Sequence, residues 1–342
     1  MKLPKLPRYI WGLSAVGTAV GFYVLLKDTS GGYKYEGHEK LVGKTVVITG
    51  ATSGIGKSTA EDLAIRGGRI IMACRDMEKC ARVSQELIAS TSNVNIYCRK
   101  LDLASLQSIR EFVQSFENSE SRLDILINNA GVLCKDRSVT SDGFELTLGV
   151  NFLGRFLLTN LLLNKMINNP EPSRIVNLLC FGYKDARIDF DDFNSELNFS
   201  AKNASKIATY ANVLFTDSLA KKLKGSSVNV FAVNPGLAET SLRREFGSHK
   251  SYISGFLLKP LFVTLFKSAR QATQTVIYCS LDSSLGAQSS GKLFCDCEEE
   301  FIGSKRYNEK ISNRLWATAE VWTQLKSINM FNTNSDTNLN KT

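Results

Sequence analysis

The sequence has only two histidines, His38 and His249, among 342 residues. It has eight cysteines, but their spacing matches no framework of the kind that small disulfide-rich domains show. We therefore predict reduced thiols rather than a disulfide scaffold. The closest pair, Cys295 and Cys297, would need two further ligands nearby to bind zinc, and the histidines are far away in sequence. The sequence therefore predicts no metal site.

The sequence also lacks a concentrated basic surface. Lys and Arg outnumber Asp and Glu by 42 to 33, which gives a formal net charge of +9, but the basic residues are scattered along the chain. Proteins that bind nucleic acid usually cluster their basic residues on one face, so we predict no nucleic-acid partner. The modest excess instead suits a polyphosphate cofactor or an anionic membrane surface.

Charge is absent from one long N-terminal run, Tyr9–Leu26, which is 18 residues long and preceded by three basic residues. At about 1.5 Å per residue, a helix of this length nearly spans a hydrocarbon core of about 30 Å. We predict a membrane anchor over 1–28 and a linker over 29–43; a cleaved signal peptide or a buried first helix are the alternatives. The spacing of Gly17 and Gly21 permits close helix approach, which leaves a homodimer possible.

From residue 44 onward, short apolar runs alternate with amphipathic helices. Uninterrupted apolar runs are typical of parallel strands that helices cover on both faces. This pattern predicts a Rossmann-type, doubly wound α/β sheet in a single domain over 44–326, with a disordered Asn- and Ser-rich tail over 327–342. The predicted strands are Thr45–Thr49, Arg69–Cys74, Asn95–Leu101, Leu123–Asn128, Arg174–Leu179 and Val228–Asn234.

The first predicted strand leads directly into a glycine-rich turn, TGATSGIG, which ends at Gly56 and precedes a helix. Glycine lets the backbone turn sharply and approach a pyrophosphate, whose charge is then stabilised by the N–H groups at the helix N-terminus. The strand before and the helix after supply the context that a dinucleotide-binding motif requires.

Four motifs, in order and at the usual spacing, resemble the short-chain dehydrogenase/reductase superfamily: TGATSGIG, Asp102-Leu103, Asn128–Gly131 and Asn234–Gly236. The resemblance extends over about Gly43–Leu293, and strings such as ACRDMEKC and DILINNAGV resemble its retinol dehydrogenase branch. It implies a membrane-anchored oxidoreductase that interconverts retinal and retinol, or another lipophilic aldehyde and alcohol. The mitochondrial inner membrane is the preferred location, with the endoplasmic reticulum as the alternative.

The resemblance also implies a set of cofactor-binding residues. Asp102 would hold the adenine amino group, and Pro235 and Gly236 would contact the nicotinamide end. After the second strand the chain has Arg75, where a carboxylate would bind the ribose 2′-hydroxyl of NAD(H), so NADP(H) is preferred over NAD(H). The alternative for Arg75 is a solvated loop residue. The predicted cofactor-binding residues are Gly50, Thr52, Ser53, Gly54, Ile55, Gly56, Arg75, Asp102, Leu103, Asn129, Ala130, Gly131, Pro235, Gly236 and Thr240.

Hydride transfer in this superfamily uses a Tyr as proton donor or acceptor, a Lys four residues later that lowers its pKa, a Ser and an Asn. Asn151 matches the Asn. Counting back from Ala211–Thr216 places Ser205 at the Tyr position and Thr209 at the Lys position, while Cys180 stands near the end of the fifth strand where the Ser is expected. Three of the four predicted catalytic positions are therefore substituted.

Other residues would have to take over the missing proton transfer. A shift of register by three residues uses Lys206 but puts Lys202, which cannot replace a phenol, at the Tyr position. Tyr210 is one residue beyond Thr209, about 100° around the helix. Tyr183 and Lys184 could reach the site on a loop.

Three hypotheses follow. The chain is an NADP(H)-dependent retinal or aldehyde reductase with an unusual acid/base, a catalytically impaired relative that binds NADP(H) or a lipid as a scaffold or partner, or an ordinary enzyme whose sequence carries a local gene-prediction error across Phe199–Thr209. The apolar and aromatic segment Tyr252–Phe266 suits a lid over a lipophilic pocket, a surface on the bilayer or a buried helix.

Overall fold

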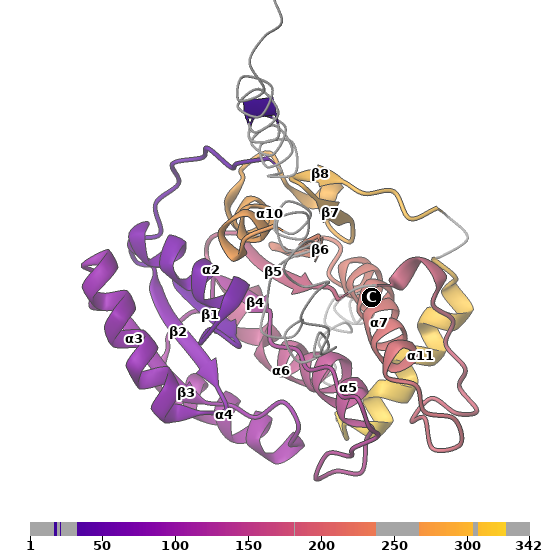
Figure 1. The fold of residues 1–342 in the computed structure, drawn as a ribbon. Helices are drawn as coiled ribbons and strands as arrows, with labels where there is room; N and C mark the ends of the chain where they lie inside the picture. The colour runs from indigo at the N-terminus through magenta and orange to yellow at the C-terminus, as the bar shows by residue number, and fades with distance from the viewer. Residues whose placement is uncertain are drawn as a thin grey trace, which may run out of the picture.

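The computed structural model describes residues 17–18, 21, 33–180, 182–236, 267–303 and 307–325. The strands are β1 Thr45–Thr49, β2 Arg69–Cys74, β3 Ile96–Lys100, β4 Ile125–Asn128, β5 Ser173–Leu178, β6 Val228–Asn234, β7 Leu293–Cys295 and β8 Glu298–Glu299. They form one sheet in the order β3-β2-β1-β4-β5-β6-β7-β8 (Figure 1). All neighbouring pairs are parallel except β7 and β8.

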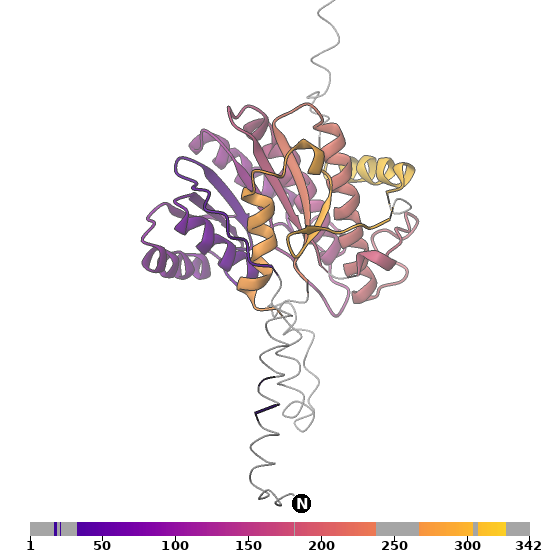
Figure 2. The same cartoon turned by 90° about the horizontal axis from the view of Figure 1, so that it is seen from above.

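The helices are α2 Gly54–Ile65, α3 Met77–Thr91, α4 Leu106–Ser119, α5 Leu146–Leu148, α6 Gly154–Ile167, α7 Ala201–Lys222, α10 Ala269–Leu281 and α11 Glu309–Trp322. A π-helical turn, Gly149–Leu153, joins α5 to α6, and short 3-10 turns lie at Tyr183–Asp185 and Ala287–Ser289. Helices α2, α3 and α10 cover one face of the sheet and α4, α6 and α7 the other, with α11 packed outside α7 (Figures 1 and 2). The predicted doubly wound α/β fold is confirmed.

Side chains alternate between the two faces along each strand, as the pleat requires. In β1, Val46 and Ile48 pack in the core beneath α2, α3 and α10, whereas Val47 packs in the core beneath α4 and α6. All six predicted strands are present, three of them with the predicted bounds. β7 and β8 were not predicted, because runs of three and two residues carry no recognisable periodicity.

One helical stretch of the described residues, Leu146–Ile167, is long and apolar enough to cross a membrane, but 89% of it is buried inside the protein, so it serves as a core helix. Of the predicted anchor Tyr9–Leu26, only Gly17, Thr18 and Gly21 are described, and these are helical. The rest of that anchor, Thr240, the segment Tyr252–Phe266 and the tail 327–342 lie outside the described residues.

The prediction of reduced thiols is wrong for one pair: Cys80 of α3 and Cys98 of β3 form a disulfide bond, with their Cα atoms 6.0 Å apart. Helix α3 packs directly on β3, and this tertiary contact brings the two thiols together. The linear spacing of the cysteines contains no sign of it. The closest pair in sequence, Cys295 and Cys297, remains reduced at the turn between β7 and β8.

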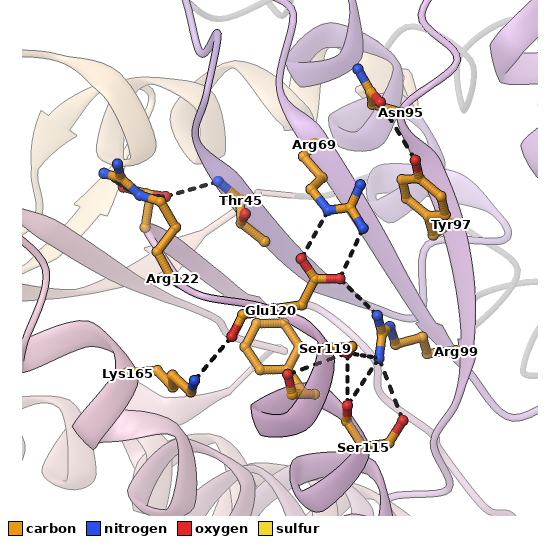
Figure 3. Close-up of polar contacts among 12 residues, drawn as sticks. Thr45, Arg69, Asn95, Tyr97, Arg99, Ser115, Ser119, Glu120, Arg122 and Lys165 are labelled. Atoms are coloured by element: carbon orange, nitrogen blue, oxygen red, sulfur yellow. Dashed lines mark hydrogen bonds and ion pairs between the residues drawn. The ribbon is translucent and has the colours of Figure 1, made fainter.

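A buried carboxylate, Glu120, ties together the end of the sheet remote from the strand carboxyl termini (Figure 3). Glu120 is 6% exposed and accepts hydrogen bonds from Arg69 Nε at 2.8 Å, Arg69 Nη2 at 3.0 Å and Arg99 Nη2 at 2.7 Å. The Arg69 guanidinium also lies 4.0 Å from the ring centre of Tyr97. This network fixes β2 and β3 against the end of α4.

We expect Glu120→Gln to lower the free energy of unfolding by about 3 kcal/mol, because it leaves two arginines without their carboxylate at a buried position. Glu299→Gln is the matched control, since the side chains of its partner Lys292 and of Glu299 are 40% and 47% exposed; it should cost less than about 1 kcal/mol. Denaturant unfolding of the two variants measures both values. Equal losses would contradict the importance assigned to Glu120.

Candidate functional site

A cavity of about 640 Å³ opens at the carboxyl ends of β1, β2, β4, β5 and β6. Ligands of doubly wound sheets bind at this edge. Of the predicted site residues, Gly56, Asn151 and Thr209 do not line the cavity, and Thr240 lies outside the described residues. The predicted residues that line it are Gly50, Thr52, Ser53, Gly54, Ile55, Arg75, Asp102, Leu103, Asn129, Ala130, Gly131, Cys180, Ser205, Pro235 and Gly236.

The glycine-rich turn after β1 approaches its neighbours too closely for a side chain. Gly50 has a φ of +66°, and a Cβ on it would lie 2.8 Å from Ala130 Cα. A Cβ on Gly56 would lie 2.4 Å from Asn129 Nδ2 and 2.5 Å from Gly50 O. Gly56 therefore acts by letting the turn close against the loop after β4, while Gly50–Ile55 form the cavity wall.

The side chains of Thr49 and Asn129 join the ends of β1 and β4. Thr49 Oγ1 accepts hydrogen bonds from the backbone N–H groups of Asn129 and Ala130, both at 3.0 Å. The Asn129 amide donates to Thr49 O at 2.9 Å and to Gly50 O at 3.1 Å. The Asn129 side chain thus positions the glycine-rich turn, which we call the phosphate cradle, instead of pointing its amide at a ligand.

The N-terminus of α2 is open toward the cavity. Ser53 is the N-cap residue, its hydroxyl makes no capping hydrogen bond, and the first turn of α2 contains no acidic residue. The first N–H groups of a helix lack intrahelical partners and carry a partial positive charge. With Ser53, Gly54 and Ile55 on the cavity wall, this end of α2 fits the phosphates of a dinucleotide.

The β2 end of the cavity carries two cations. Arg75 forms no ion pair with any other described residue. Lys79 lines the same wall and was not predicted from the sequence. Its position four residues after Arg75 could have indicated it as a second cation of the site. Asp76 also lies here, but its Oδ1 caps α3 by accepting from Lys79 N at 2.9 Å. Asp102 Oδ1 accepts from Ala104 N at 3.0 Å, which leaves Oδ2 available for a ligand.

The opposite end of the cavity carries two of the positions that the sequence predicted as catalytic, Cys180 and Ser205. Burial raises the pKa of the Cys180 thiol, against the opposing effect of the nearby Arg155 guanidinium. The thiol therefore stays protonated and is a weak donor. Thr209, one turn after Ser205, is buried and donates its hydroxyl hydrogen to Ser205 O at 2.8 Å. No ammonium group stands at that position to lower a neighbouring pKa.

Asn151 is engaged away from the cavity. Its Oδ1 accepts from Val132 N and its Nδ2 donates to Val132 O, both at 2.8 Å. Its backbone carbonyl accepts from Asn212 Nδ2 at 2.7 Å. The Asn151 side chain therefore holds the loop that follows β4 against the π-helical turn Gly149–Leu153.

Tyr183 does not line the cavity either. Tyr183 is buried and accepts from Asn234 Nδ2 at 3.3 Å. Burial, together with a hydrogen bond to Glu300, raises the pKa of Tyr183, the opposite of what an acid/base catalyst needs. Lys184 pairs with Glu300 at 2.7 Å instead of supporting the phenol.

The residues of the shifted register also point elsewhere. Lys202 is exposed to solvent, and Lys206 packs against Gly182 with its Nζ 3.9 Å from Asp185 Oδ2. Tyr210 is buried in the core beneath α4, α6 and α7. Of the described residues that line the cavity, none is a tyrosine, and the one lysine, Lys79, stands at the β2 end.

Arg155 lines the cavity and was not predicted from the sequence. It is 2% exposed, donates from Nη1 to Leu178 O at 2.6 Å and from Nε to Ala130 O at 3.2 Å, and contacts Ala130 O through Nη2 as well. Burial lowers its pKa to about 10, so it remains a cation at neutral pH. Its position as a charged residue inside the apolar run Phe152–Leu163 could have marked it in the sequence as a candidate site residue.

Comparisons with known proteins agree with this geometry. The family model for short chain dehydrogenases matches residues 44–251. Retinol dehydrogenase 13 of Homo sapiens is 46% identical over 311 residues, which cover 91% of this chain and 93% of that protein. Retinol dehydrogenase 13 of Mus musculus is 44% identical over 310 residues, covering 90% and 92%.

The fold has a solved counterpart in a protein from Mycobacterium paratuberculosis that is described as uncharacterized. It matches with a TM-score of 0.67 and 29% identity, covering 86% of this chain and 98% of that one. The sequence comparisons, the glycine-rich turn and the sheet topology therefore point to the same family. The chain belongs to the short chain dehydrogenase family, a family of nicotinamide-dependent oxidoreductases, and within it resembles the retinol dehydrogenases.

Proposed function

We propose that this chain binds NADP(H) in the cavity at the carboxyl edge of its sheet and transfers hydride poorly, if at all, by the route that the family uses. The observation that carries the proposal is the contrast between the two ends of the cavity. The phosphate cradle has its glycines, its open helix N-terminus and its cations, whereas the other end has Cys180 and Ser205 where hydride transfer needs a Ser and a Tyr.

The preference for NADP(H) over NAD(H) rests on the charge at the end of β2. A 2′-phosphate pairs well with a guanidinium, whereas a carboxylate would favour the 2′-hydroxyl of NAD(H). Arg75 has no ion-pair partner among the described residues, and Lys79 adds a second cation. Asp76 is the opposing charge at this end, and its Oδ1 caps α3 by accepting from Lys79 N.

The loss of turnover rests on proton-transfer chemistry. A phenol has a pKa of about 10, and a neighbouring ammonium lowers that pKa further. The aliphatic hydroxyl of Ser205 does not become a useful base. Loss of a general acid/base typically slows a reaction by about 10²- to 10⁴-fold. Cofactor binding does not depend on these groups, because none of them belongs to the phosphate cradle.

The relatives named retinol dehydrogenase support a retinoid or a similar lipophilic aldehyde or alcohol as the second ligand. Tyr9–Leu26 supports attachment to a membrane, with the mitochondrial inner membrane preferred to the endoplasmic reticulum.

A second candidate function is slow reduction of a lipophilic aldehyde with an unusual acid. It is favoured by Cys180 and Ser205, which both present hydrogen-bond donors to the same cavity.

The 2′-phosphate site predicts a selective effect of Arg75→Ala. The dissociation constant of NADPH should rise by about tenfold or more, because a charge-assisted contact to a phosphate is lost, while that of NADH should hardly change. Fluorescence titration of the detergent-solubilised full chain measures both constants. Arg82→Ala is the control, since Arg82 is exposed on α3 away from the cavity. Equal weakening of NADH and NADPH by Arg75→Ala would exclude the assigned contact.

Restoring the proton-transfer groups should restore turnover. We expect the triple variant Cys180→Ser, Ser205→Tyr, Thr209→Lys to oxidise NADPH with all-trans-retinal about 100-fold faster than the natural chain or more. Lys202→Tyr is the register control: it completes a Tyr-xxx-Lys pattern with Lys206, but on an exposed position, and should have no effect. Rapid turnover by the natural chain, or activation by Lys202→Tyr alone, would show that the catalytic positions are misassigned.

A further inference from the structure

Arg155 is a buried cation without a counter-charge at one end of the cavity. Burying a charge is costly unless a partner compensates it. The guanidinium is held by the carbonyl oxygens of Ala130 and Leu178, which are dipoles and not charges. Among the described residues it forms no ion pair with a carboxylate.

Three lysines of the neighbouring elements lie beside carboxylates. Lys267, which approaches Gly236, pairs with Asp296. Lys184 pairs with Glu300 at 2.7 Å. The Nζ of Lys206 lies 3.9 Å from Asp185. Of the described residues that line this end of the cavity, Arg155 is the cation, and it has no carboxylate partner.

Arg155 belongs to the nicotinamide half of the proposed cofactor site. The adenosine half is defined by Arg75 and Asp102 at the ends of β2 and β3, and the phosphates by the glycine-rich turn after β1. Arg155 is fixed to the ends of β4 and β5, on the far side of that turn, and shares the cavity wall with Gly131 and Pro235.

We propose that Arg155 makes this site selective for the reduced cofactor, NADPH, over NADP⁺. The two forms carry the same phosphates and differ by one positive charge, which lies on the oxidised nicotinamide ring. A fixed cation beside the ring repels the oxidised form and leaves the neutral reduced ring unaffected. The inference rests on the proposed cofactor binding and adds to it a preference between redox states.

The preference has a consequence for the chemistry. By linkage, a protein that binds NADPH more tightly than NADP⁺ makes the bound cofactor a weaker hydride donor. Arg155 thus acts in the same direction as the substituted proton-transfer positions. Both favour retention of reduced cofactor over its use.

The test compares the dissociation constants of NADP⁺ and NADPH for the full chain in detergent, by calorimetry at pH 7 and low salt. We expect NADPH to bind about tenfold more tightly or better, a difference that a single unit charge can supply in a partly desolvated site. Arg155→Gln should bring the ratio close to one, whereas Arg155→Lys, which keeps the charge, should preserve the preference.

A second pair of variants leaves the hydrogen bonds of Arg155 in place, in case Arg155→Gln does not fold. Cys180 lies near enough to Arg155 for a charge on one to shift the pKa of the other. Cys180→Asp supplies the missing counter-charge and should abolish the preference, while the uncharged Cys180→Asn should retain it.

Three outcomes would overturn the inference. These are equal affinities of the natural chain for the two forms, a preference that persists in both Arg155→Gln and Cys180→Asp, and equal loss of preference in Cys180→Asp and Cys180→Asn. Failure of the natural chain to bind either form would instead refute the proposed function, and the inference with it.

Discussion

The junction between β1 and β4 is the constraint on which both ends of the site depend. Thr49 Oγ1 accepts from two consecutive N–H groups of the loop after β4, and the Asn129 amide returns two hydrogen bonds to Thr49 and Gly50. This closure places the glycine-rich turn at contact distance from Ala130. It also fixes the Ala130 carbonyl, to which Arg155 is bound. The phosphate cradle and the buried cation therefore share one support.

The two halves of the cavity differ in how much they depend on particular side chains. Phosphate binding is carried by backbone N–H groups, by glycine conformations and by a helix terminus, so it tolerates change in the rest of the site. Proton transfer needs a titratable group at one position with a defined neighbour. Substitution at Cys180, Ser205 and Thr209 can therefore remove the second property without disturbing the first. The effect proposed for Arg155 acts in the same direction as the proposed loss of proton transfer.

The fold and the glycine-rich turn after β1 were predictable from the sequence because both depend on local patterns. Uninterrupted apolar runs gave the strands of the parallel sheet, and TGATSGIG gave the turn and the start of α2. Features that depend on tertiary contact were missed. The Cys80–Cys98 bond requires the packing of α3 on β3, and the Glu120 network joins residues of three elements. The role of Arg155 depends on two carbonyls, at Ala130 and Leu178, that are distant from it in sequence.

The central claim is that the natural chain retains NADPH without rapid hydride transfer, and a single-turnover experiment tests it most directly. The full chain, saturated with NADPH, is mixed with excess all-trans-retinal, and the fluorescence of the bound cofactor is followed with time. The account predicts that the fluorescence persists, with oxidation at least about 100-fold slower than an ordinary dehydrogenase would show. Complete oxidation of the bound NADPH at rates on the order of 1–1,000 s⁻¹, typical of enzymes, would contradict it.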